Sequence, residues 1–586
     1  SDAAAATQRD EGRTVIFFVD DIHLADHSTV RVRKSLLRFV DEQMREGDQV
    51  LLFTTTGQLG FLQQFTTDKE LLRLAINRLA YKAAERYERG EWRVSMDEYQ
   101  ALRIERHDRQ VLEFFAAEVA KELLMPSPGP SRATANSRRA AGSTSAPSYI
   151  ERIVYERARS ILQQAAASTR ATLRTLENLV RAVAPLPGRK LLLFASDGFL
   201  VENPNGNASE EMRRVSDAAA HSGTVVYSIE ARGLVTGVPD ASERQGFSLT
   251  GMNLEMKSFA NTKAQEPLSS LASMTGGRAL LNSNDLNLGF KEGLSETSEY
   301  YLLAWQPAGG AGASNKFRRV EVGVKGRPEL RVRVRQGFFG EPPPPPDAAA
   351  DAKRTPTERL FDALRSVTPV RQLPTSLGAG FVNDPAAGMV LVVSLEVDAA
   401  TLGVARGAGA QAEVDVAAAV VNLDGKNVNG FEQSLLFKPD ATPDGGGRRV
   451  VYTRQLKVAP GRYQLRAAAR DRRTGRAGSA LRWVEVPDIK PGRLSLSSIF
   501  VGEVAAGGAG RKLEPQADAR FARGSRLGFL VYVYNAALSA GRPDVALQVN
   551  VFRDKEVVVS LPLLRLNAVP GADAARMPFG EEVSLE

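Results

Sequence analysis

The segment that decides the fold lies near the start of the chain and reads Arg13-Thr-Val-Ile-Phe-Phe-Val-Asp-Asp-Ile-His-Leu-Ala-Asp-His-Ser28. An apolar run, Val15 to Val19, is followed directly by two carboxylates, Asp20 and Asp21. A continuous apolar strand is typical of a parallel sheet that helices cover on both faces. Carboxylates at the carboxyl end of such a strand lie where open α/β sheets bind ligands. The segment therefore predicts the first strand of an α/β domain, with a candidate site at its end.

A second strand of the same design comes much later and reads Arg189-Lys-Leu-Leu-Leu-Phe-Ala-Ser-Asp197-Gly198-Phe199. If both strands belong to one parallel sheet, Asp20 and Asp197 lie near each other at one rim. Between them, residues 48–54 predict a strand that ends at Thr54, and residues 68–79 predict an amphipathic helix. Strands that alternate with helices predict a doubly wound, Rossmann-like α/β sheet.

These motifs resemble those of von Willebrand factor A domains, in particular the divergent branch found in large bacterial envelope proteins. In that family the first strand ends in Asp-x-Ser-x-Ser, a later strand ends in Asp-Gly, and a Thr from a middle loop completes a Mg²⁺ site. Here Asp197-Gly198 is present, but the first motif reads Asp20-Asp21-Ile22-His23-Leu24. Ile and Leu supply no oxygen ligand, and Mg²⁺ prefers six oxygens. The resemblance therefore implies the fold together with a degenerate metal-ion-dependent adhesion site.

The resemblance covers about residues 13–340. It includes a helix that ends at Gly276-Gly277, a strand with Tyr300-Tyr301-Leu302 and a basic strand that ends in Gly337-Phe338-Phe339. We expect antiparallel strands between about 298 and 340 because apolar and polar residues alternate there. The metal ligands that the resemblance leaves are Asp20, Asp21 and Asp197. No cofactor is expected, apart from Mg²⁺ or another divalent cation at that site.

The region from about 81 to 150 predicts an insertion into the α/β domain. It holds a helical segment with Ser95 and Glu98 at capping-box spacing, and then a Pro/Ser/Ala/Gly-rich stretch, 126–147. A long helix is predicted from 150 to 183, and a polar loop over 231–262. The Thr ligand of the family comes from this part of the fold. Thr169, Thr172 and Thr175 lie inside the predicted helix, where a Thr is more often a plain helix residue than a ligand.

The remaining chain is predicted to be β-rich. Residues 1–12 form an N-terminal tail, 341–356 a stiff Pro-rich linker, 357–490 an Ig-like β-sandwich and 491–586 a second β module that by strand count looks incomplete. A short helix is predicted over 357–367. Strands are predicted over 389–397, 412–423, 448–458, 463–470, 481–486, 494–501, 526–534, 545–552 and 556–561.

The composition excludes several classes of protein. The 586 residues contain no Cys, which excludes disulfides, thiolate catalysis and Cys-ligated zinc. The net charge of +8 is small for this length, and basic residues alternate with acidic ones, so nucleic-acid binding is not expected. No apolar run reaches the roughly 20 residues of a transmembrane helix. No signal segment is visible at Ser1, but the resemblance implies a secreted, periplasmic or cell-surface protein.

The chemistry around Asp20 leaves two interpretations open. His23 and His27 lie four residues apart beside Asp20, Asp21 and Asp26, and such a cluster could hold Zn²⁺. Alternatively, Asp26 or Ser28 is the N-cap of the following helix, which explains the polar turn without a metal. We favour the cap. No nucleophile elbow or phosphate-binding loop accompanies the turn, and adjacent strand residues such as Asp20 and Asp21 point to opposite faces.

The sequence therefore favours a non-enzymatic adhesion or assembly protein. Its expected partners are other proteins, including further copies of the chain or a larger envelope assembly. The resemblance implies that the rim bearing Asp20, Asp21, His23, Thr54 and Asp197 contacts the partner. The alternative is a metal-dependent enzyme or sensor that uses Asp20, Asp21, His23 and Asp197.

Overall fold

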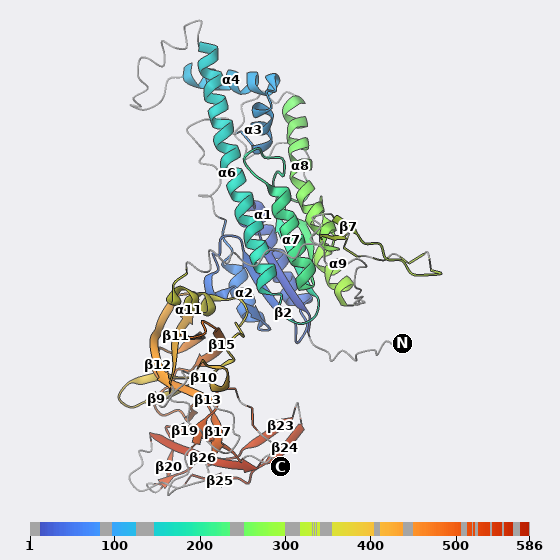
Figure 1. Ribbon diagram of the computed structural model, residues 1–586. Helices are drawn as coiled ribbons and strands as arrows, with labels where there is room; N and C mark the ends of the chain where they lie inside the picture. The colour runs from blue at the N-terminus through green and yellow to red at the C-terminus, as the bar shows by residue number, and fades with distance from the viewer. Residues whose placement is uncertain are drawn as a thin grey trace. The chain divides into compact units, whose positions relative to one another are not determined.

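The computed structural model divides the chain into two units, Ser1–Pro346 and Asp347–Glu586 (Figure 1). Most of the predicted tail, the Pro-rich part of the insertion and the proline linker lie outside the described residues. The described residues are 12–81, 96–124, 146–234, 251–298, 317–339 without 328, 331, 333 and 336, 354–403, 411–437, 449–504, 513–539 without 519 and 522–525, 542–553, 556–566 and 575–584.

The first unit is built on a mixed sheet with the strand order β3-β2-β1-β4-β5-β6. Only the short edge strand β3 runs antiparallel to its neighbour, so the order is that of a doubly wound sheet. Val19 pairs with Thr54 on one side and Ala195 on the other, so β1, β2 and β4 end together at one edge. The bounds are β1 (Thr14–Val19), β2 (Gln49–Thr54), β3 (Phe65–Thr66), β4 (Lys190–Ser196), β5 (Thr224–Glu230) and β6 (Ala279–Leu280).

Helices pack on this sheet in two groups. The first group holds α1 (Asp26–Glu42), α2 (Lys69–Asn77) and α9 (Asn287–Ser298), and the second holds α6 (Ala146–Ala182), α7 (Ala208–Ser222) and α8 (Gly251–Thr275). Phe17 of β1 packs edge-on against Phe39 of α1 and Phe290 of α9, with ring centroids 4.7 and 5.2 Å apart. The apolar run Val15 to Val19 of β1 is buried throughout, which confirms the expectation of a strand covered on both faces.

The predicted insertion contributes a helical lobe (Figure 1). α3 (Glu98–Glu105) and α4 (Arg109–Leu124) pack on α6, and α3 also contacts α8. The lobe has its own apolar core, which includes Leu102, Phe115, Leu162 and Met256. The prediction of a loop over 231–262 is wrong from residue 251 onward, because α8 begins there and buries Met256 in this core.

The predicted capping box at the start of α3 is also wrong. The N-cap is Asp97, whose side chain accepts a hydrogen bond from Gln100 N at 2.7 Å, while the Gln100 side chain accepts one from Asp97 N at 2.9 Å. The helix starts two residues later than the sequence spacing suggested, so Glu98 is its first residue. Of the predicted antiparallel strands near 298–340, the structure describes the pair β7 (Phe317–Arg319) and β8 (Gly337–Phe339), and residues 299–316 lie outside the described residues.

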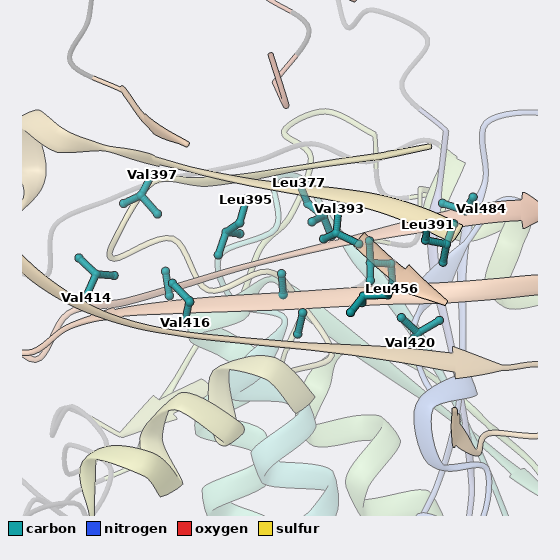
Figure 2. Close-up of a cluster of buried hydrophobic side chains, with 14 of the residues drawn as sticks. Leu377, Leu391, Val393, Leu395, Val397, Val414, Val416, Val420, Leu456 and Val484 are labelled. Carbon is teal, nitrogen blue, oxygen red and sulfur yellow. The ribbon is translucent and has the colours of Figure 1, made fainter. Parts of the chain in front are cut away.

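The second unit begins with α11 (Pro356–Arg365) and continues in antiparallel sheets. Two of these, β13-β10-β9 and β12-β11-β14-β15, face each other across an apolar core that includes Leu391, Val393, Val416 and Leu456 (Figure 2). The bounds are β9 (Thr375–Asp384), β10 (Gly388–Asp398), β11 (Ala412–Asn422), β12 (Asn427–Phe437), β13 (Arg449–Lys457), β14 (Gly461–Asp471) and β15 (Ala477–Val486).

The last part of the second unit holds a further sheet and several two-stranded sheets. β19 (Arg526–Tyr534), whose predicted bounds are confirmed, pairs with β16 and β17 and also with β26. Tyr534 Oη accepts a hydrogen bond from Asn383 N at 2.7 Å, which ties this sheet to β9. The other bounds are β16 (Ser495–Leu496), β17 (Phe500–Val504), β18 (Leu513–Pro515), β20 (Leu538–Ser539), β21 (Arg542–Pro543), β22 (Ala546–Leu547), β23 (Asn550–Arg553), β24 (Glu556–Ser560), β25 (Leu564–Arg565) and β26 (Arg576–Ser584).

Among the described residues, none of the helices has an apolar stretch long enough to span a bilayer.

Candidate functional site

The candidate site lies at the carboxyl edge of the first sheet, between β1 and β4. The strand order reverses at this point, since β2 and β3 follow β1 on one side and β4 to β6 lie on the other. Open α/β sheets bind ligands at such a switch point. Asp20 directly follows β1 and Asp197 directly follows β4, so the two residues lie at the same edge of the sheet, as their positions after two apolar strands predict.

Asp20 is the centre of the rim and is fully buried. Its Oδ1 accepts hydrogen bonds from Thr172 Oγ1 at 2.9 Å and Thr55 Oγ1 at 3.2 Å. Its Oδ2 is bonded to Ser196 Oγ at 2.7 Å and to His23 Nδ1 at 2.8 Å. Burial by itself would raise the pKa of Asp20, but His23 and the hydroxyl donors lower it below its ordinary value. Asp20 is therefore held as a carboxylate.

His23 reaches Asp20 because the chain turns sharply after β1. His23 N and Leu24 N both donate to Asp20 O, at 3.1 and 3.0 Å. The imidazole ring lies 5.4 Å from the Phe199 ring, centroid to centroid, and its Nδ1 lies 3.4 Å from Thr172 Oγ1. The side chain is only 13% exposed. The turn thus folds the ring back onto the carboxylate that precedes it.

Asp21 points away from Asp20, toward the exit of β2. It accepts hydrogen bonds from Thr56 N at 3.0 Å, from Thr56 Oγ1 and from Gln58 Nε2 at 2.7 Å. Burial raises the pKa of Asp21, and the Thr56 donors oppose this rise. Thr54, which the sequence placed in the partner-binding rim, is also turned inward: its N and Oγ1 donate to Gln63 Oε1 at 2.8 and 3.0 Å.

Asp197 stabilises the start of α1. Its Oδ2 accepts a hydrogen bond from Ala25 N at 2.7 Å, and its backbone carbonyl accepts one from Arg232. The N-cap residue of α1 is Ala25, whose side chain makes no capping bond, so the prediction of Asp26 or Ser28 as the cap is wrong. The Asp197 carboxylate, which follows β4, therefore accepts a backbone hydrogen bond at the start of α1, as a capping side chain normally does.

Two residues of this site were missed or underrated in the sequence. Thr172 lies within α6 and was expected to be a plain helix residue, but its hydroxyl reaches Asp20. Glu98, at the start of α3, comes from the helical lobe and lies close enough to His23 for the two charges to interact. Burial raises the pKa of Glu98 to about 7, while His23, Asn203 and the Leu200 backbone oppose that rise. No sequence signal could have shown that α3 lies over this rim.

The five predicted rim residues are largely shielded from solvent. Asp20 and Thr54 are 0% exposed, Asp21 4% and Asp197 6%. Large partners need accessible side chains, so direct contact at these positions is disfavoured. His27 and Asp26 are exposed on α1 and do not join the rim.

The side chains of the rim do not fit a divalent cation. An ionised carboxylate offers about four lone-pair positions, and four donors already approach Asp20. Asp21 and Asp197 are directed toward Thr56 and Ala25, and so do not converge on Asp20. In the described part of the chain, no three His, Asp or Glu side chains come together in a group suited to a metal ion.

No protein-family model matches the chain, and no curated protein matches it either.

Proposed function

We propose that this chain is a non-enzymatic protein-binding and assembly protein of the bacterial cell envelope. Its head is a von Willebrand factor A-like domain with a degenerate metal site, and Ig-like β modules follow. Secretion to the periplasm or cell surface belongs to the same proposal. Its partner is another protein or a second copy of the chain.

The head supports this proposal through its strand order and its motifs. The order β3-β2-β1-β4-β5-β6 is a doubly wound order, and Asp20 and Asp197 follow the two strands at its switch point. The metal-dependent enzyme or sensor that we considered would need Asp20, Asp21, His23 and Asp197 to act on one ligand. Asp20 and His23 contact each other, whereas Asp21 and Asp197 accept hydrogen bonds from Gln58 and Ala25. The four side chains therefore do not converge on one ligand, which favours the binding protein over the enzyme.

The observation that carries the proposal is the hairpin formed by β23 and β24. Phe552 and Val557 are cross-strand neighbours and are 58% and 51% exposed, and Val558 is 44% exposed. In the described part of the chain these two strands pair only with each other. A two-stranded hairpin is at best marginally stable in water, and exposed apolar surface of this kind marks interaction sites. We infer that a protein partner covers this hairpin.

The experiment uses the full chain with a photo-crosslinking amino acid in place of Phe552, expressed in the bacterium that carries the protein. Irradiation should give a discrete crosslinked product, and size-exclusion chromatography with light scattering should show whether that product is a second copy. The exposed Leu436 on β12, 70% exposed, is the matched control position.

A second variant connects the crosslink to the apolar hairpin. Val557→Ser should reduce the crosslinked product at position 552 by at least about tenfold. The variant loses an apolar contact with the partner, and a loss of about 1.4 kcal/mol of binding free energy weakens the binding constant tenfold. The melting temperature should stay the same, because Val557 is exposed. A chain that gives no product at 552, or equal products at 552 and 436, would contradict the proposal.

A further inference from the structure

The arrangement around Asp20 accounts for the loss of the metal-binding motif. In the family that the sequence resembles, a divalent cation neutralises the carboxylate at the end of the first strand. Here the two Ser positions of that motif are Ile22 and Leu24, and Leu24 is 1% exposed in the apolar core. A buried carboxylate without close polar partners is strongly unfavourable. Some other group must therefore compensate Asp20.

We propose that the His23 imidazole takes the place of the divalent cation, so that the rim is a metal-free polar anchor. The ring nitrogen lies 2.8 Å from Asp20 Oδ2, so the ring occupies the side of the carboxylate where a cation would bind. Thr172 and Ser196, which donate to the same carboxylate, complete the set of partners. The inference concerns the head alone and does not depend on the partner-binding proposal.

The anchor joins elements that are far apart in the sequence. Asp20 follows β1, Thr55 follows β2, Ser196 ends β4 and Thr172 lies in the middle of α6. The helix α6 also carries the core of the helical lobe, through residues such as Leu162. The Asp20 cluster therefore holds the helical lobe on the sheet edge, at the position where related domains bind a metal.

The test compares His23→Ala with the wild-type chain and with His27→Ala, a control at an exposed histidine four residues further on. Thermal melts are recorded in EDTA and then with MnCl₂ at millimolar concentration. We expect His23→Ala to lower the melting temperature of the first unit by about 5 °C or more, because a buried carboxylate loses a hydrogen-bond partner. His27→Ala should melt like the wild type.

The change in melting temperature with Mn²⁺ distinguishes a histidine that replaces a cation from a histidine with a purely structural role. Removal of the ring leaves space beside Asp20, Thr172 and Ser196, so Mn²⁺ should raise the melting temperature of His23→Ala and leave that of the wild type unchanged. A wild-type chain that Mn²⁺ stabilises, or a folded His23→Ala chain that ignores Mn²⁺, would overturn the inference. If His23→Ala does not fold, calorimetric titration of MnCl₂ into the wild-type chain decides: stoichiometric binding would overturn the inference, and absence of binding would support it.

Discussion

At the scale of single residues, the rim depends on one carboxylate whose partners come from distant parts of the chain. The sequence identified Asp20 because two charges follow an apolar strand, and that pattern is local. It did not identify Thr172 or Ser196 as partners, because their approach depends on the packing of α6 and β4. It also placed Thr54 at the rim, whereas the next residue, Thr55, makes the contact. Both hydroxyls are buried, and a shift of one residue along the chain decides which of them reaches Asp20.

The first prediction concerns Thr172→Val. Valine keeps the shape of the side chain but removes the hydroxyl that donates to Asp20, so a buried carboxylate oxygen loses a partner. We expect the free energy of unfolding to fall by about 1–3 kcal/mol, measured by urea unfolding. Thr175→Val, one turn further along α6, is the control and should change stability by less than about 0.5 kcal/mol. Equal effects of the two variants would show that the hydrogen bond to Asp20 is unimportant.

The second prediction concerns the pH dependence that Glu98 introduces. Its pKa rises from 4.5 to about 7 in the folded protein, so the folded state holds a proton that the unfolded chain releases. The contribution of Glu98 to stability is therefore fully present below about pH 4.5 and is lost as the pH rises through about 7.

Glu98→Gln removes this titration. The free energy of unfolding of the variant, relative to that of the wild type, should increase by about 1–3 kcal/mol between pH 4.5 and pH 8. Urea unfolding of both proteins at the two pH values gives the difference. A difference that does not change with pH would contradict the burial of Glu98 beside His23.

At the scale of helices and strands, the regular patterns were predicted well and the close contacts were not. The strand that precedes Asp20, the helix from 69 to 77 and the strand from 526 to 534 all follow clear periodicities. The sequence missed β9, because Gly378 and Gly380 interrupt the apolar pattern that predicts a strand. Glycines fit at these two positions because side chains of β10 and of the neighbouring sheet pack closely against them. It also missed β12, an edge strand with mostly exposed side chains, which lacks a strong apolar pattern.

The third prediction concerns Gly198, the residue after Asp197. Its φ is +81°, and an added Cβ would lie only 2.0 Å from the Ala264 carbonyl oxygen of α8. Gly198→Ala should therefore destabilise the first unit by roughly 2–5 kcal/mol, through the combined strain and overlap. Gly326 has a similar φ of +78° but no atom within 4 Å of an added Cβ, so Gly326→Ala should cost only about 1 kcal/mol. Thermal melts of the two variants separate backbone strain from close packing.

At the scale of the whole molecule, the composition and the proline-rich segment predicted several domains, and the structure resolves two units, each with its own apolar core. The coarse order, an α/β part followed by antiparallel sheets, could be read from the change in periodicity near residue 340. The helical lobe and its contact with the rim could not, since its core joins residues from separate segments such as Leu102, Leu162 and Met256.

The fourth prediction is that the two units unfold in separate transitions. Leu391 is fully buried between the two sheets of the second unit, so Leu391→Ala should lower the free energy of unfolding of that unit by about 2–5 kcal/mol. In scanning calorimetry of the full chain, this variant should shift one transition and Thr172→Val the other. A single transition that both variants shift equally would show that the units unfold as one.

The most direct test of the metal-free rim is the melting temperature of the wild-type full chain in EDTA, compared with millimolar Mg²⁺ and Mn²⁺. A ligand that binds only the folded state must raise the melting temperature. Because four donors already occupy the Asp20 carboxylate, we expect the transition of the first unit to be the same under all three conditions. A rise of several degrees with either ion, absent in Asp20→Asn, would show instead that the rim is a working metal site.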